Sequence, residues 1–139
     1  MSTVEIYVKD IMNTDFKSVR QDVSVKKAAE LLAKYKIGAL AVSDEKDGLV
    51  GMFSERDVVT KVVSLGKDYN ETLVKDVMSS PVLTVSVTAS AEAAWKIMSD
   101  KQIRHLPVVD DNGAPVGMLG ARSLLEVLCQ YFSDIFTGK

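Results

Sequence analysis

A serine, an arginine and an aspartate lie close together in the stretch Gly51–Asp57 (Gly-Met-Phe-Ser-Glu-Arg-Asp). The apolar residues predict a strand, and Ser54 with Asp57 three residues later predicts the capped start of a helix. A helix start offers free N–H groups and a positive dipole end, which suit a phosphate, as does the Arg56 cation. The Asp57 carboxylate can accept hydrogen bonds from vicinal hydroxyls. The stretch therefore fits a phosphorylated ribose, although an ordinary capped helix has the same pattern.

The chain repeats itself with an offset of 66 residues. Val8–Met12 returns as Val74–Met78, and the register holds without a gap as far as Arg56 and Arg122. Chance does not keep register over such a length, so the pattern indicates a duplication. We place the repeats at 8–66 and 74–136, with an N-terminal segment at 1–7 and a linker at 67–73. Two copies predict a pseudo-twofold pair rather than a longer array.

The pattern of each repeat predicts strands and helices in the order β-α-β-β-α, which places the expected fold in the α+β class. Asp10–Met12 is too short for a packed helix and is interpreted as a turn. Ser24 and Ser90 are expected helix caps, and Gly38 is expected to close the first helix in the left-handed region. The expected strands are 16–19, 39–43 and 49–53 in the first copy and 81–85, 105–109 and 115–119 in the second. The expected second helices are 57–65, with Val58, Val59, Val62 and Val63 apolar, and 123–136.

The apolar face of the last helix is wider than a small domain needs for its own core. A symmetric homodimer would bury the excess, but so would packing of the helix across the first repeat, and both remain open. Trp95, on an apolar helix face, is expected in the core.

Composition excludes several classes of function. The formal charge of −2 provides no basic surplus for a nucleic-acid partner, and no apolar run approaches the roughly 20 residues of a membrane span. The first five residues lack the form of a signal peptide. Cys129 is the single cysteine, which excludes an internal disulfide and fits the cytoplasm, and it is expected to be buried. With one histidine, no cysteine pair, no P-loop and no nucleophile–base pair, neither a metal site nor an enzyme is expected.

Three motifs, used in the same order twice, resemble the cystathionine-β-synthase (CBS) domain pair, also called a Bateman module. They are Val74–Met78, Ile103–Asp110 (Ile-Arg-His-Leu-Pro-Val-Val-Asp) and Gly51–Asp57. The resemblance covers roughly Val8 to Phe132. It implies a regulatory module, not an enzyme, that senses cellular energy by binding AMP, ADP or ATP, or in some members S-adenosylmethionine or NAD. It also implies homodimers and a separate regulated protein, and no required cofactor.

The resemblance assigns roles to individual residues. Asp57 would accept from the ribose hydroxyls, Ser54 would donate to ribose or phosphate, and Arg56 would lie near the phosphate. The second repeat would line the adenine with Val82, Leu83 and Thr84 and face the phosphate with Arg104 and His105. The full expected set is Met52, Phe53, Ser54, Arg56, Asp57, Val82, Leu83, Thr84, Arg104, His105 and Pro107.

A second, weaker site is expected at Gly117–Ser123, where the second repeat departs from the Gly51–Asp57 motif. Gly120 stands in place of the hydroxyl, and Ser123 stands in place of the carboxylate. A serine can bond a ribose, but without charge assistance. The expected residues are Phe16, Lys17, Gly38, Ala39, Gly120, Arg122 and Ser123. The alternative function is a dimerisation or protein-interaction module whose nucleotide site is vestigial.

Overall fold

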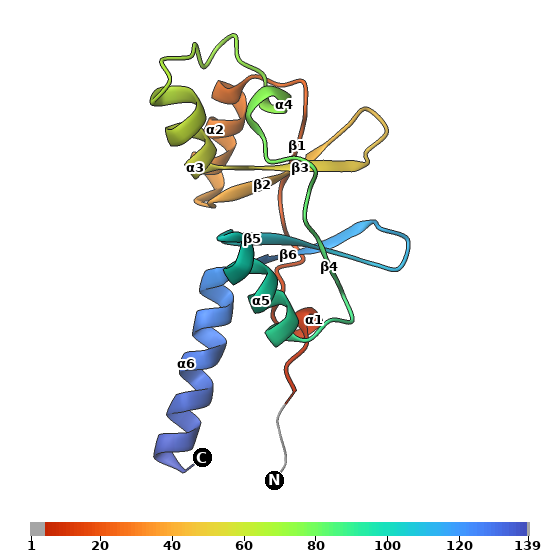
Figure 1. Ribbon diagram of the computed structural model, residues 1–139, viewed down its shortest axis with the longest axis vertical. Helices are drawn as coiled ribbons and strands as arrows, with labels where there is room; N and C mark the ends of the chain where they lie inside the picture. The colour runs from red at the N-terminus through yellow and green to blue at the C-terminus, as the bar shows by residue number, and fades with distance from the viewer. Residues whose placement is uncertain (1–4, 139) are drawn as a thin grey trace. The chain divides into compact units, whose positions relative to one another are not determined.

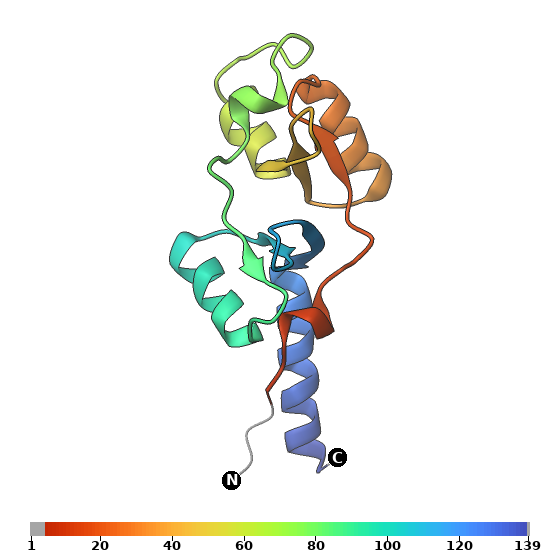
Figure 2. The same cartoon turned by 90° about the vertical axis from the view of Figure 1, so that its right-hand side faces the viewer.

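The computed structural model describes residues 5–138 and divides the chain into two compact units (Figures 1 and 2). One unit is Phe16–Leu83, and the other combines Met1–Asp15 with Thr84–Lys139. The units therefore do not coincide with the sequence repeats, because each repeat's opening segment belongs to the other unit. Residues 1–4, which carry most of the signal-peptide interpretation, lie outside the described residues.

The unit Phe16–Leu83 is built on a three-stranded sheet in the order β1-β2-β3. β1 is parallel to β2, and β2 is antiparallel to β3. The core includes Leu40, Val42, Phe53, Val62 and Val74, all fully buried. The elements are β1 (Ser18–Arg20), α2 (Val25–Tyr35), β2 (Ala39–Ser43), β3 (Leu49–Ser54), α3 (Glu55–Asp57), η1 (Val58–Val63) and α4 (Val74–Val77).

The second unit repeats this sheet as β4-β5-β6, with the same parallel and antiparallel pairs. The opening segment of the first repeat completes the core of this unit, since Val8 is fully buried in one cluster with Leu106 and Leu119. The predicted turn at Asp10–Met12 is a single α-helical turn ending at Ile11. The elements are α1 (Val8–Ile11), β4 (Val85–Ser86), α5 (Ala91–Lys101), β5 (His105–Val109), β6 (Pro115–Gly120) and α6 (Ala121–Thr137).

The two long first helices begin where the sequence predicts. Ser24 Oγ accepts from Lys27 N and Ser90 Oγ accepts from Ala93 N, each at 3.1 Å. The prediction that Gly38 closes α2 in the left-handed region was wrong. Lys36, at φ 53°, takes that position, as Gln102 does in α5 at φ 54°.

The helix after β3 differs from the prediction in form and in burial. It starts as α3 and continues as the π-helix η1, with Ser64 N bonded to Val59 O at 3.0 Å. Of the four valines expected on its apolar face, only Val62 is buried, while Val59 and Val63 are 61% and 66% exposed. π-helical turns inside helices often mark functional positions.

Two further burial predictions were wrong. Trp95 is half exposed, and Cys129 is exposed. Both lie on helices that carry more apolar residues than the core of their unit buries. Within the part of the chain that the structure describes, no helix has both the length and the apolar character needed to cross a membrane.

Gly51 in β3 and Gly117 in β6 occupy corresponding positions, so the same substitution to alanine can be compared at both. A Cβ on Gly51 would lie 2.6 Å from Met78 Sδ and 2.9 Å from the Ser79 carbonyl oxygen. The three atoms nearest to a Cβ on Gly117 would all belong to the Met12 side chain, with Sδ at 2.5 Å. We expect Gly51→Ala to cost about 1–3 kcal/mol, because backbone cannot move aside, and Gly117→Ala to cost less than about 1 kcal/mol. Urea denaturation measures both, and equal losses would contradict the distinction.

Candidate functional site

The turn from β3 into α3 forms a reciprocal cap around Asp57. The Ser54 N–H donates to Asp57 Oδ2 at 2.9 Å, and the Asp57 N–H donates to Ser54 Oγ at 3.3 Å. The Ser54 hydroxyl also lies 3.3 Å from Oδ2, which is long for an O–H···O bond. The capping box predicted from Ser54 and Asp57 is therefore confirmed. Asp57 is 5% exposed and is the buried charged residue of the described chain.

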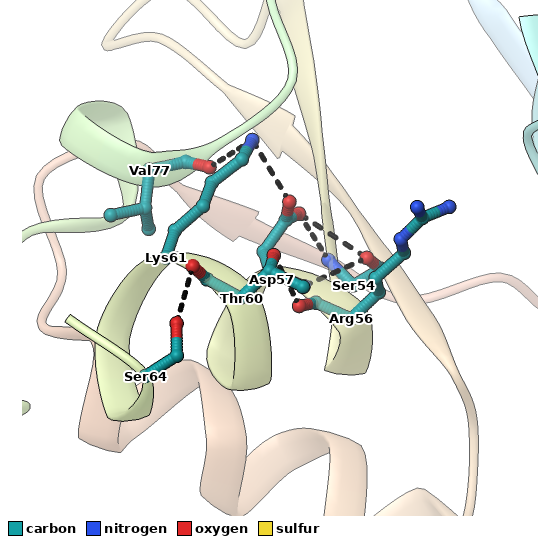
Figure 3. Close-up of polar contacts among 7 residues, drawn as sticks. All are labelled: Ser54, Arg56, Asp57, Thr60, Lys61, Ser64 and Val77. Atoms are coloured by element: carbon teal, nitrogen blue, oxygen red, sulfur yellow. Dashed lines mark hydrogen bonds and ion pairs between the residues drawn. The ribbon is translucent and has the colours of Figure 1, made fainter.

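Lys61 completes the surroundings of this carboxylate (Figure 3). Its Nζ lies 3.0 Å from Asp57 Oδ1 and donates to the Val77 carbonyl at 3.0 Å. Sequence reasoning missed Lys61. The signal was present, because an acidic residue four positions before a lysine on a helix is a favourable pair.

The expectation of free N–H groups at this helix start is wrong for three of them. The Glu55 N–H donates to the Gly38 carbonyl at 3.0 Å, and the amides of Ser54 and Asp57 are used in the cap. A phosphate at this turn would therefore depend mainly on side-chain cations.

Arg56 is the side-chain cation next to the cap. It is exposed, and in Figure 3 its guanidinium extends away from Lys61. Its backbone carbonyl accepts from Thr60 Oγ1 at 2.8 Å, and the Thr60 carbonyl accepts from Ser64 Oγ at 2.7 Å. Arg56 is thus held by its backbone while its charge faces solvent.

The other expected residues of the main site fall into two groups. Met52, Phe53, Val82 and Leu83 belong to the same unit as Asp57, although the repeat pattern assigns Val82 and Leu83 to the second copy. Met52 pairs with Ser79, three residues before Val82, through Ser79 N to Met52 O at 2.8 Å. Phe53 is fully buried in the core, so its side chain is not available to a ligand in this structure.

The remaining main-site residues, Thr84, Arg104, His105 and Pro107, belong to the other unit. His105 and Pro107 lie on β5, and Pro107 is fully buried. Arg104 is exposed immediately before this strand, and its carbonyl accepts from Ala121 N at 2.8 Å.

The residues of the weaker second site are also divided. Phe16, Lys17, Gly38 and Ala39 belong to the unit of Asp57, and Gly120, Arg122 and Ser123 belong to the other unit. Gly120 is the N-cap residue of α6 and provides no side-chain cap, and Arg122 forms an exposed pair with Glu126 at 3.5 Å. The turn at Gly120–Ser123 therefore lacks both the cap and the buried carboxylate of its counterpart.

The Asp57 carboxylate can accept from a vicinal diol with a small rearrangement. A carboxylate has about four lone-pair sites, and Ser54 and Lys61 supply three donors, the longest being the Ser54 hydroxyl. Exchange of that long bond for a ribose hydroxyl leaves the amide bond and the Lys61 pair intact. The residues present thus fit the ribose part of a nucleotide. Among residues 5–138, no three His, Cys, Asp or Glu side chains are grouped to hold a metal ion.

Comparison with known proteins identifies the family. The CBS domain family matches the chain twice, at residues 8–64 and 74–130, so the chain belongs to the CBS-domain family as a tandem pair. It is 35% identical over 105 residues to the CBS domain-containing protein YhcV of Bacillus subtilis, covering 76% of this chain and 74% of that protein.

Two further relatives extend the comparison. An uncharacterised protein of Methanopyrus kandleri, MK0525, is 43% identical over 96 residues, which cover 69% of this chain and about half (49%) of that protein. The crystal structure of the CBS-domain protein ATU1752 of Agrobacterium tumefaciens superposes with a TM-score of 0.81 at 29% identity, covering 91% of this chain and 96% of that one. The fold is that of a CBS-domain pair.

Proposed function

We propose that this protein is a sensor that binds an adenosine nucleotide, AMP, ADP or ATP, and signals to a separate partner protein. The observation that supports it most directly is the Asp57 carboxylate, which is buried, ionically paired and capped at the turn where the family resemblance expects the ribose. Maintaining a buried charge is costly, and a helix cap does not require one. The proposal places the protein in the cytoplasm, where its single cysteine, Cys129, stays reduced.

The second candidate is a ligand-free interaction module. It is favoured by the internal hydrogen bonds that already satisfy much of the Asp57 carboxylate and of the neighbouring amides. The two candidates differ in one measurable property, which is saturable binding of a nucleotide.

Isothermal titration of one sample with AMP, ADP, ATP, NAD and S-adenosylmethionine tests the sensor. A separate aliquot of the protein is first denatured, and its supernatant is analysed to show that no nucleotide was carried through purification. We expect saturable binding of an adenosine nucleotide and, at 100 times its Kd, a gain of about 2.7 kcal/mol in the free energy of unfolding. Flat titrations for all five ligands, from a folded sample, would favour the interaction module.

We also propose that the protein forms a homodimer through its helices. On α6 only Leu124 is buried, and in both views the C-terminal part of this helix extends beyond α5 (Figures 1 and 2). Its exposed apolar side chains are 43% to 83% exposed: Leu125, Leu128, Tyr131, Phe132, Ile135 and Phe136. In the other unit, an apolar groove of about 360 Å³ lies between α2 and η1, with Val25, Ala29, Val58, Val63 and Tyr69 in its lining. Apolar surfaces of this kind typically mark protein interfaces.

The dimer is tested with two charge-matched variants of α6. We expect Phe132→Glu to dissociate the dimer, because it places a charge in the apolar face, and Ser133→Glu to leave it intact. Ser133 follows Phe132 directly, but successive residues of an α-helix point about 100° apart, so Ser133 lies outside the apolar face. Sedimentation equilibrium gives the mass of each variant. A monomeric wild type at high concentration, or an unchanged mass for Phe132→Glu, would refute the proposal.

A further inference from the structure

Lys61 connects two separate segments of the unit Phe16–Leu83. One contact is with the Asp57 carboxylate on α3, and the other is with the carbonyl of Val77, the last residue of α4. Both distances are 3.0 Å (Figure 3). Carbonyls at the end of a helix have no partner within it, so the Lys61 ammonium satisfies a group that α4 leaves open.

The two contacts fix the orientation of the Asp57 carboxylate. Ser54 holds Oδ2, and Lys61 holds Oδ1, so rotation about the bond to the carboxyl group would break at least one of them. The side chain of Asp57 is 7% exposed, whereas that of Lys61 is 41% exposed. Lys61 therefore supplies the opposing charge that a buried carboxylate requires, while its own side chain is only partly buried.

The second repeat lacks both members of this pair. At the same offset of 66 residues, Ser123 stands opposite Asp57 and Val127 stands opposite Lys61. The two differences occur together, in the repeat whose turn also has no side-chain cap. Lys61 is therefore present where the buried carboxylate is present, and its counterpart is absent where the carboxylate is absent.

The α4 segment in turn contacts the strand that leads to the cap. Ser79 and Met52 exchange two backbone hydrogen bonds, at 2.8 and 3.2 Å. The end of α4 is therefore held on one side by β3 and on the other by Lys61. The chain continues from Ser79 to Val82 and Leu83, which are expected to line the adenine.

We propose that Lys61 is a positioning residue of the nucleotide site: it orients Asp57 for the ribose and links that carboxylate to the end of α4. The inference rests on the proposed nucleotide binding. Ribose hydroxyls that bond to Asp57 share the carboxylate with Lys61. Because the Asp57–Lys61 pair is kept, a bound nucleotide holds Lys61, and with it the Lys61–Val77 contact, more firmly. The end of α4 and the residues after it thereby respond to occupation of the ribose position.

A double-mutant cycle tests the positioning role, with AMP or ATP, whichever the wild type binds, as the probe. We expect Lys61→Met to lower the affinity about tenfold, through loss of one charge-assisted contact, and Lys61→Arg to restore part of it. In the Asp57→Asn background, Lys61→Met should have little further effect, because Lys61 acts through Asp57. Lys75→Met, which removes an exposed charge on α4, is the matched control and should bind as the wild type does.

Hydrogen exchange tests the link to α4 with the same variants. We expect nucleotide to change the protection of the Met78 and Ser79 amides in the wild type and in Lys75→Met, but not in Lys61→Met. If Asp57→Asn abolishes binding while Lys61→Met binds and exchanges as the wild type does, the Lys61 inference is overturned and nucleotide binding stands. If the folded wild type binds no nucleotide, the proposed function fails, and the inference fails with it.

Discussion

We expect Asp57→Asn to weaken nucleotide binding at least about 100-fold, because the ribose loses two charge-assisted hydrogen bonds. The amide keeps the shape of the carboxylate and can still accept from the Ser54 N–H, so the cap survives. Lys61 loses its partner, but its half-exposed ammonium can turn to water. Asp57→Ala should weaken binding as strongly, although it also removes the cap. Titration calorimetry measures the affinity, and thermal unfolding shows that each variant is folded.

Ser123→Ala is the control for this prediction. Ser123 occupies the position of Asp57 in the second repeat, and we expect its removal to change the affinity little. The two substitutions thus compare a buried, paired carboxylate with a neutral hydroxyl at the same place in the repeat. Equal losses from Asp57→Asn and Ser123→Ala would exclude the idea of one strong and one weak site.

We expect Phe53→Ala to cost about 3–5 kcal/mol of stability, the largest loss of any single change considered. Phe53 is fully buried in the core of its unit, and the sheet and helices around it cannot collapse into the space of a whole ring. Such a loss is a large part of the roughly 5–15 kcal/mol that stabilises a typical protein. Urea denaturation gives the loss as a lower midpoint.

Leu65→Ala is the control for Phe53→Ala. Leu65 follows η1 and is 64% exposed, so its truncation should change stability by no more than about 0.5 kcal/mol. The counterpart of Phe53 in the second repeat, Leu119, is also fully buried, and Leu119→Ala should cost about 2–5 kcal/mol. A small effect at Phe53 would mean that its side chain is not part of the core and is free to contact a ligand.

Most elements of the fold could be predicted, because helix caps and hydrophobic periodicity depend on residues close together in the sequence. The strand expected at 81–85 was largely wrong, since β4 is only Val85–Ser86. β2 and β5 have the predicted bounds, and Ser24 and Ser90 cap their helices as expected. The helix closure was misjudged because Gly38 has the intrinsic preference for positive φ, yet α2 ends two residues earlier, at Lys36. The N–H of Lys36 bonds to the carbonyls of Leu32 and Ala33, so the helix closes there despite a preference of about 1 kcal/mol for glycine in the left-handed region.

The residues of the Ser54–Asp57 cap could be predicted from the sequence, but their burial and their long-range hydrogen bonds could not. The spacing of Ser54 and Asp57 predicts the cap, and the structure confirms it. The spacing could not show that the Gly38 carbonyl takes the Glu55 amide, because that bond joins residues far apart in the chain. Nor could it show the burial of Asp57, since burial depends on the whole unit. The ion pair of Lys61 with Asp57 could have been predicted from their spacing of four residues. The second contact of Lys61, with Val77, depends on the placement of α4.

The division of the chain into units also bears on its biosynthesis. The unit Phe16–Leu83 is one continuous segment, whereas the other unit needs residues from both ends of the chain. As the polypeptide leaves the ribosome, the continuous unit is complete first. Val8 is synthesised before this continuous unit, but its burial site forms only after Leu106 and Leu119 have been made. The order of synthesis therefore favours folding of the unit that carries Asp57 before the unit that carries α6.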